Sequence, residues 1–146
     1  MSPDPRTYRL TIASSTEMLD VVDNTSEEIS REAGCSEEDR YHLSLSVREA
    51  VANAIKHGNQ FAEDKDVAIR FEVSADRIQI WVRDQGEGFE PGDVPDPTDP
   101  AQLLSPSGRG LFYMNHFMDE VSVQPADGGG SEVHMIKYLK GKDSAP

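Results

Sequence analysis

Two pairs of short segments with alternating apolar and polar residues constrain the fold of this chain more than any other feature. Residues 67–73 and 77–83 alternate with a period of two and are separated by a short turn. Residues 120–124 and 131–139 form a second pair, joined through Gly128-Gly129-Gly130. Because successive side chains of a strand point to opposite faces, this alternation predicts two antiparallel hairpins, each with one buried face.

The segments around these hairpins predict one more strand and three helices. β-Formers alternate over residues 8–12 and predict a first strand. Ser14 and Glu17 stand at capping-box spacing and predict a helix that ends at Gly34. A short third helix is expected over residues 111–118. Together the elements predict an α+β fold, a two-layer sandwich of a mixed, mostly antiparallel sheet with its helices on one face.

Length and charge narrow the class of protein. The chain has 146 residues, the size of one domain, so we expect a single domain with its core within 6–140. The net charge of −13 argues against binding nucleic acid or an anionic membrane surface. There is neither an apolar run of about 20 residues nor a secretory signal. A lone Cys35 forms no intramolecular disulfide and no multi-cysteine metal site. We therefore expect a cytoplasmic protein.

The second predicted helix carries the first candidate chemistry. It begins after Ser36 and ends near Gly58. Glu49 and Asn53 are four residues apart, so they share one face of the helix, away from its apolar stripe. A carboxylate and an amide oxygen one turn apart can position a water and a hard cation, and Mg²⁺ prefers oxygen ligands and shares substrate phosphates. A solvated polar face is the alternative for this segment taken alone.

The segment Asp84-Gln85-Gly86-Glu87-Gly88 directly follows an apolar strand. An Asp at a strand end can accept a hydrogen bond from the exocyclic amine of a base, while the glycines let the backbone pass close to a flat ring. A glycine-bearing turn with a solvated Asp is the alternative. A calcium loop is a third interpretation, but the spacing is not that of an EF-hand.

Residues 90–107 are rich in proline and glycine, and long connections of this kind are usually functional lids or disordered. Directly after them, Gly108-Arg109-Gly110 opens the third helix, whose N–H groups form an anion site. Arg109 adds a guanidinium that can reach a terminal phosphate. An exposed Arg at the end of a glycine-rich loop is the alternative. The spacing is neither that of a Walker A loop nor that of a dinucleotide fingerprint.

The ordered combination of these motifs is far more specific than each motif alone. It resembles the ATP-binding domain shared by gyrase, heat-shock chaperone, histidine-kinase and mismatch-repair ATPases, over nearly the whole chain. Within that superfamily, residues 49–58, 108–114 and 118–121 resemble the bacterial anti-sigma-factor serine/threonine kinases.

The resemblance implies a role for each motif residue. It implies Glu49 as the general base, Asn53 as the ligand of Mg²⁺ and Asp84 as the acceptor for the adenine amine. The remaining implied roles concern the nucleotide: Gly86 and Gly88 shape the adenine pocket, Gly108 and Gly110 let the lid and helix start wrap the phosphates, Arg109 contacts the terminal phosphate, and Ser131 matches the family's glycine-Thr/Ser box near the base.

The implied function is an ATP-binding anti-sigma factor with Mg²⁺-dependent serine/threonine kinase activity. It would phosphorylate an anti-anti-sigma (STAS-type) partner and so control sequestration of a sigma factor in a stress response; a homodimer is expected. An ATP-dependent partner-binding switch without significant phosphotransfer is the alternative, although Glu49 favours the kinase because a binding module needs no base. A sensor histidine-kinase fragment is disfavoured because there is no room for a phosphoacceptor helix pair, and a DNA-topology or mismatch-repair ATPase because no transducer domain is present. A nucleotide-free scaffold stays open.

Overall fold

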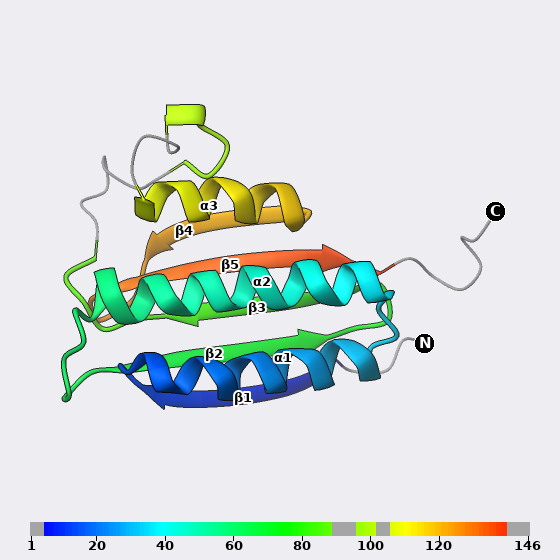
Figure 1. The fold of residues 1–146 in the computed structure, drawn as a ribbon, viewed down its shortest axis with the longest axis horizontal. Helices are drawn as coiled ribbons and strands as arrows, with labels where there is room; N and C mark the ends of the chain where they lie inside the picture. The colour runs from blue at the N-terminus through cyan, green and yellow to red at the C-terminus, as the bar shows by residue number, and fades with distance from the viewer. Residues whose placement is uncertain (1–4, 89–95, 102–105, 140–146) are drawn as a thin grey trace.

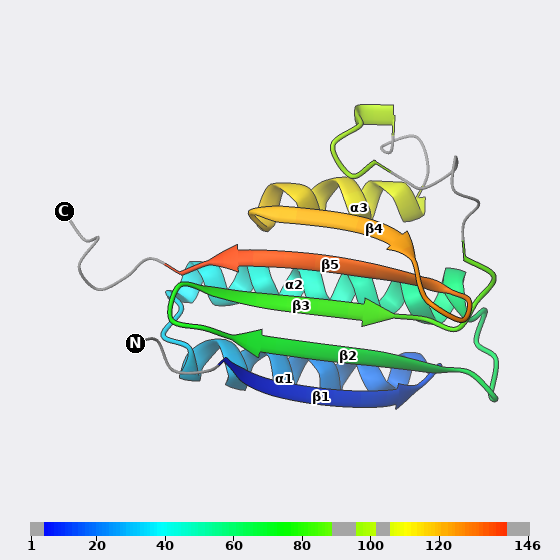
Figure 2. The same ribbon diagram turned by 180° about the vertical axis from the view of Figure 1, so that it is seen from behind.

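The computed structural model describes residues 5–88, 96–101 and 106–139, with the backbone alone for 106–109. In this part of the chain, five strands form one sheet in the order β1-β2-β3-β5-β4. Three α-helices lie on one face of that sheet, as Figures 1 and 2 show from opposite sides. The elements are, in chain order, β1 (Arg6–Ala13), the 3-10 turn η1 (Thr16–Met18), α1 (Leu19–Glu32), α2 (Glu37–Asn53), the π-helical turn η2 (Ala54–Gly58), β2 (Asp66–Val73), β3 (Arg77–Arg83), α3 (Pro106–Phe117), β4 (Glu120–Pro125) and β5 (Ser131–Tyr138).

Both predicted hairpins and the α+β fold are confirmed. β2 pairs with β3 and β4 pairs with β5, each antiparallel, with Phe71 opposite Ile80 in the first hairpin and Val121 opposite Met135 in the second. β1 adds to β2, and β5 pairs with β3, which joins the two hairpins into one sheet. All four of these pairings are antiparallel, so the described strands contain no parallel component of a mixed sheet.

The core lies between the helices and the sheet. Alternate residues of β2 and β3 are fully buried toward the helices, as the period of two predicts. On the helix side, α2 contributes Leu43, Val47 and Val51, each with no more than 1% of its surface exposed. Within the described ranges, none of the helices has the length and hydrophobicity needed to cross a lipid bilayer.

The helix ends follow the sequence signals in two cases and depart from them in a third. The Ser36 side chain caps α2 by accepting from Asp39 N at 3.1 Å, and Gly34 leaves α1 with a φ of +84°. The predicted cap at Ser14 is wrong, because Ser15 accepts from Glu17 N at 3.4 Å instead. The hydroxyl of Ser14 is buried and donates to Lys65 O at 2.6 Å, a tertiary contact that no local pattern predicts.

The third helix begins earlier than predicted. It was expected over residues 111–118, but α3 starts at Pro106 and ends at Phe117. Proline favours the first helical position because its φ is already suitable and its missing N–H costs nothing there. Gly108 and Gly110 therefore lie inside the first turns of α3 rather than in a loop before it.

The opposite face of the sheet carries an aromatic and polar stack, and none of the described helices covers it (Figure 2). Trp81 of β3 stacks on His134 of β5, with ring centroids 4.5 Å apart and an angle of 7° between the planes. The Arg70 guanidinium lies 4.0 Å from the centre of the Trp81 ring. Gln79 Oε1 is 3.0 Å from His134 Nε2. The imidazole is thus half-buried between neighbouring strands.

The buried setting of His134 predicts a loss of stability at acid pH. Burial lowers the pKa of His134, and Arg70 acts in the same direction, against the opposing effect of Glu132, Glu120 and Glu72. Since the unfolded chain has the higher His pKa, about 6.5, the unfolded chain binds the proton first as the pH falls. The contribution of neutral His134 to the free energy of unfolding is therefore complete above about pH 6.5, and it is lost as the pH falls toward the folded-state pKa.

The measurement is chemical denaturation followed by the fluorescence of Trp81, the single tryptophan of the chain. We expect His134→Gln to have a flatter dependence of unfolding free energy on pH than the parent chain in the acid range. Identical slopes for the two proteins would contradict the expectation, because other titrating groups are common to both.

Candidate functional site

Asp84 lies just after β3, is 5% exposed, and accepts three hydrogen bonds. Ser131 Oγ donates to its Oδ2 at 2.7 Å, and Ser131 N donates to its Oδ1 at 3.1 Å. Gly86 N also donates to Oδ1, at 2.9 Å. The two oxygens of a carboxylate have about four acceptor positions, so Oδ2 keeps one for a further donor. The fold thus brings together three of the predicted site residues and orients the carboxylate firmly.

Glycines surround this carboxylate because their neighbours leave no room for a side chain. A Cβ on Gly58 would overlap the carboxylate of Asp84, and one on Gly130 would overlap the Asp84 backbone carbonyl. A Cβ on Gly86 would overlap the carbonyl of Gly58, and one on Gly88 would overlap the carbonyl of Gly130. The C-terminal end of η2, the loop after β3 and the start of β5 therefore meet at backbone contact around Asp84.

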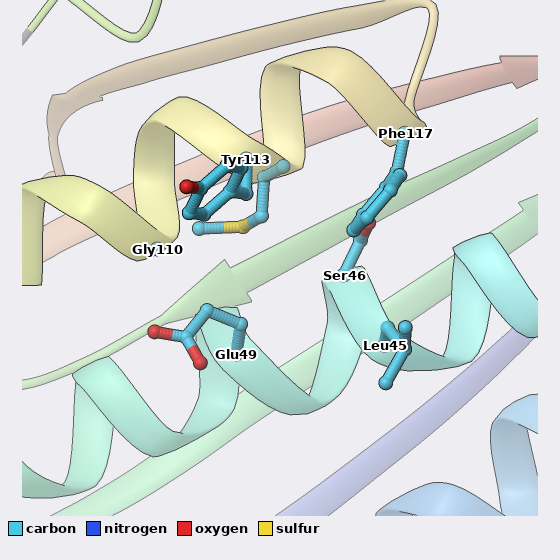
Figure 3. Close-up of a pocket in the computed structure, with 7 residues that line it drawn as sticks. Leu45, Ser46, Glu49, Gly110, Tyr113 and Phe117 are labelled. Atoms are coloured by element: carbon cyan, nitrogen blue, oxygen red, sulfur yellow. The ribbon is translucent and has the colours of Figure 1, made fainter. Parts of the chain in front are cut away.

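Glu49 lies on α2 and faces α3 across a pocket. Gly110 of α3 lies directly against its carboxylate, since a Cβ there would overlap Glu49 Oε1. The pocket has a volume of about 330 Å³, and Figure 3 shows the carboxylate at its wall, across from Tyr113. Its lining is otherwise largely apolar: Leu45, Met114 and Phe117, with Gly110 and Ser46.

Asn53 is the last residue of α2, one turn beyond Glu49 and on the same face, and it is half-buried. The helical path continues through η2 to Gly58, which lies against Asp84. Within residues 5–88, 96–101 and 106–139, no cluster of three or more His, Cys, Asp or Glu side chains could hold a metal ion. Asn53 and Glu49 instead offer oxygen atoms of the kind that Mg²⁺ accepts together with phosphates.

Two of the predicted features fall partly outside the described residues. Of the lid expected over 90–107, the structure describes residues 96–101 and the backbone of 106–107. In the first part, Asp96 and Asp99 accept from the backbone N–H groups of Thr98 and Ala101, both at 2.9 Å. Arg109 lies in the first turn of α3, but its side chain is outside the described part, so its contact with a phosphate stays a prediction.

The sequence interpretation missed three residues of this site. Gly58 was taken only as a helix end and Gly130 only as part of a hairpin turn, although both are needed beside Asp84. Asn59 was placed in a loop, yet it is 1% exposed. A glycine directly followed by a buried amide gives no periodic signal, so only the packing of distant segments reveals these positions.

The contact between Gly110 and Glu49 yields a prediction in which stability and activity move in opposite directions. Gly110→Ala should raise the stability of α3 by about 0.5–1 kcal/mol, because glycine is a poor helix former. The new methyl group displaces the Glu49 carboxylate, so we expect any reaction that uses this carboxylate to slow by about 10- to 100-fold. Thermal unfolding and an activity assay on the same preparation measure both effects.

Asn115→Ala, also on α3, serves as the matched control. It improves helix propensity in the same element, and Asn115 is not among the residues that line the Glu49 pocket. The control should be as active as the parent chain. Full activity of Gly110→Ala would contradict the importance of the Glu49 position.

Comparisons with known proteins identify the family of this chain. The family profile described as "Histidine kinase-like ATPase domain" matches residues 12–137. The chain is 31% identical to the serine-protein kinase RsbW of Bacillus velezensis, over 97% of this chain and 91% of that protein. It is 34% identical to RsbW of Bacillus licheniformis, over 84% of this chain and 79% of that protein.

The fold is also similar to a solved structure of the RsbU and RsbW domains of a Mycobacterium tuberculosis protein. The TM-score is 0.66 at 14% sequence identity, over 92% of this chain and 32% of that one. At this identity the likeness concerns the fold alone.

Proposed function

Since this chain belongs to the family of histidine kinase-like ATPase domains and, within it, to the RsbW serine-protein kinases, we propose that it is an ATP-dependent protein kinase that acts as an anti-sigma factor. The membership confirms the resemblance drawn from the sequence motifs. The proposed reaction transfers the terminal phosphate of ATP to a Ser or Thr hydroxyl of an anti-anti-sigma partner of STAS type. That modification controls whether the kinase sequesters its sigma factor.

The observation that carries this proposal is that Asp84 and Glu49 lie near the two ends of one continuous helical path. Gly58, which touches Asp84, is nine positions beyond Glu49. At no more than 1.5 Å per helical residue these positions are at most roughly 13 Å apart along the helical path, since Ala54–Gly58 is a π-helical turn. An extended nucleoside triphosphate has a comparable length, so adenine at Asp84 places the terminal phosphate near Glu49. Asn53 lies between the two, where the phosphates would pass.

The proposed roles follow from the chemistry of each group. The remaining acceptor position on Asp84 Oδ2 suits the exocyclic amine of adenine. Asn53 would hold Mg²⁺ through its side-chain oxygen, and the bound ion neutralises charge on the phosphates. The N–H groups in the first turn of α3 face phosphates favourably, with Arg109 added for the terminal one.

Glu49 would act as the base. Its carboxylate accepts the hydroxyl proton of the substrate as the hydroxyl oxygen bonds to the terminal phosphorus, and the bond from that phosphorus to the bridging oxygen breaks to release ADP. The pocket beside Glu49 gives the hydroxyl-bearing segment of the partner a path to the carboxylate. A homodimer remains part of the proposal.

The test is a pull-down from the native host with and without Mg-ATP, followed by mass spectrometry of the captured proteins. The proposed function predicts a captured partner that gains phosphate on Ser or Thr when ATP is present. Nucleotide-dependent capture without phosphate would favour the binding switch instead. Absence of any Mg-ATP binding in calorimetry would contradict both.

A further inference from the structure

Asn59 connects four separate segments of the fold through one buried side chain. Its Nδ2 donates to the hydroxyl of Ser14, the residue just after β1, at 2.9 Å. It also donates to the carbonyl of Asp66, the first residue of β2, at 3.0 Å. Its Oδ1 accepts from Gln85 N at 2.7 Å, in the loop after β3. Its own backbone follows η2 directly, where Asn59 N donates to Ala54 O at 2.8 Å.

The contact between Asn59 and Gln85 lies next to the proposed adenine site at Asp84. Gln85 is the residue between Asp84, whose carboxylate accepts from Ser131, and Gly86, which donates to the same carboxylate. A second tether holds the same residue, since Gln85 Oε1 accepts from Asp66 N at 2.6 Å. The turn that presents Asp84 is therefore attached to β2 through Asp66 and to the end of η2 through Asn59.

The two ends of the Asn59 side-chain amide contact different parts of the fold. The Nδ2 end binds the scaffold, through Ser14 and Asp66. The Oδ1 end holds the Gln85 backbone, and with it the direction in which Asp84 points. Recognition groups have to be held to within about 0.5 Å of their working geometry by the residues behind them. Asn59 is the buried polar side chain that supports the Asp84 turn in this way.

We propose that Asn59 is a positioning residue for base selectivity, which holds the Gln85 N–H so that the Asp84 carboxylate meets the exocyclic amine of adenine. This inference rests on the proposed function, because it assumes that an adenine nucleotide binds at Asp84. It assigns Asn59 no contact with the nucleotide.

The experiment compares the dissociation constants of ADP and inosine 5′-diphosphate, each with Mg²⁺, by calorimetry and competition. Inosine carries a carbonyl where adenine carries the amine, so the ratio of the two constants reports how well Asp84 is placed. We expect Asn59→Ala to weaken ADP binding by about tenfold or more, about 1.4 kcal/mol, and to leave inosine diphosphate binding nearly unchanged. The selectivity ratio then falls by the same factor.

Ser14→Ala is the matched control. It removes the bond that Ser14 Oγ accepts from Asn59 Nδ2 and the bond that it donates to Lys65 O, and it leaves the Gln85 contact in place. It should lower the melting temperature without changing the ratio. Gln85→Ala removes the second tether at an exposed position, so it folds, and it should lower the ratio by a smaller factor than Asn59→Ala.

The outcomes separate this inference from the function on which it rests. A parent chain that binds no ADP would overturn the proposed function before any variant is compared. A parent chain that prefers ADP, with Asn59→Ala folded and equally selective, would overturn the positioning role alone. If Asn59→Ala does not fold, Asn59→Ser takes its place, because the shorter serine side chain does not reach Gln85 N. An unchanged ratio in Asn59→Ser overturns the inference, and a reduced ratio supports it.

Discussion

Glu49→Gln should reduce phosphate transfer by about 10²- to 10⁴-fold while ADP binding stays as in the parent chain. The amide has nearly the same size as the carboxylate, so it keeps the contact with Gly110 and the wall of the pocket. It cannot accept the hydroxyl proton, and removal of a general base typically costs a factor in this range. The measurement pairs the initial rate of labelled phosphate transfer to the partner with the dissociation constant of ADP.

The control for this variant is Glu38→Gln, a change of the same kind in the first turn of the same helix, where the side chain is exposed. It should transfer phosphate at the parental rate. A Glu49→Gln protein that transfers phosphate as fast as the control would remove the assignment of the base, and with it the main reason to prefer a kinase over a binding switch.

Asp84→Asn should weaken ADP binding by about 100-fold while the protein remains folded. The amide oxygen can keep the two backbone N–H donors, Ser131 N and Gly86 N, at the Oδ1 position. The amide nitrogen then replaces Oδ2, and the Ser131 hydroxyl can rotate to accept from it. The atom that faces the base changes from acceptor to donor, and a lost hydrogen bond to a charged group that leaves two donors opposed costs about 3 kcal/mol.

The same variant should bind inosine 5′-diphosphate better than ADP, because the carbonyl of inosine accepts where the amine of adenine donated. Calorimetry with both nucleotides measures this inversion. Asp127→Asn, at an exposed position near the β4–β5 turn, is the control and should keep the parental preference. If Asp84→Asn binds ADP with the affinity of the parent chain, the Asp84 carboxylate does not recognise adenine.

The strands were predicted well because their signal is local. The bounds of β3 are those predicted, 77–83, and β2 differs by one residue. The alternation of apolar and polar residues decides which side chains of a strand face the core, and it can be read from residues that are neighbours in the sequence. The start of α3 was predicted less well because Gly108 and Gly110 are poor helix formers, and packing of the helix against Glu49 and the sheet outweighs their propensity.

The site was predicted as a set of motifs rather than as an arrangement. Asp84, Gly86 and Ser131 meet in one hydrogen-bonded group, and Glu49 meets Gly110, although no pattern in the sequence links the members of either set. Their roles toward nucleotide, metal and substrate remain predictions. The resemblance that tied them together is confirmed by the family to which the chain belongs.

The amino-acid sequence by itself determined the hairpins, the amphipathic helices and the order of the motifs, because each depends on periodicity and spacing within a few turns of chain. Only the tertiary structure decided that β5 lies beside β3, that Gly58 and Gly130 close around Asp84, and that Ser14 and Asn59 bind distant backbone instead of capping or lining a loop. These arrangements depend on hydrogen bonds made by buried polar groups and on glycines that let two backbone segments come into direct contact. Both conditions arise between segments that are remote in sequence, so no local pattern carries them.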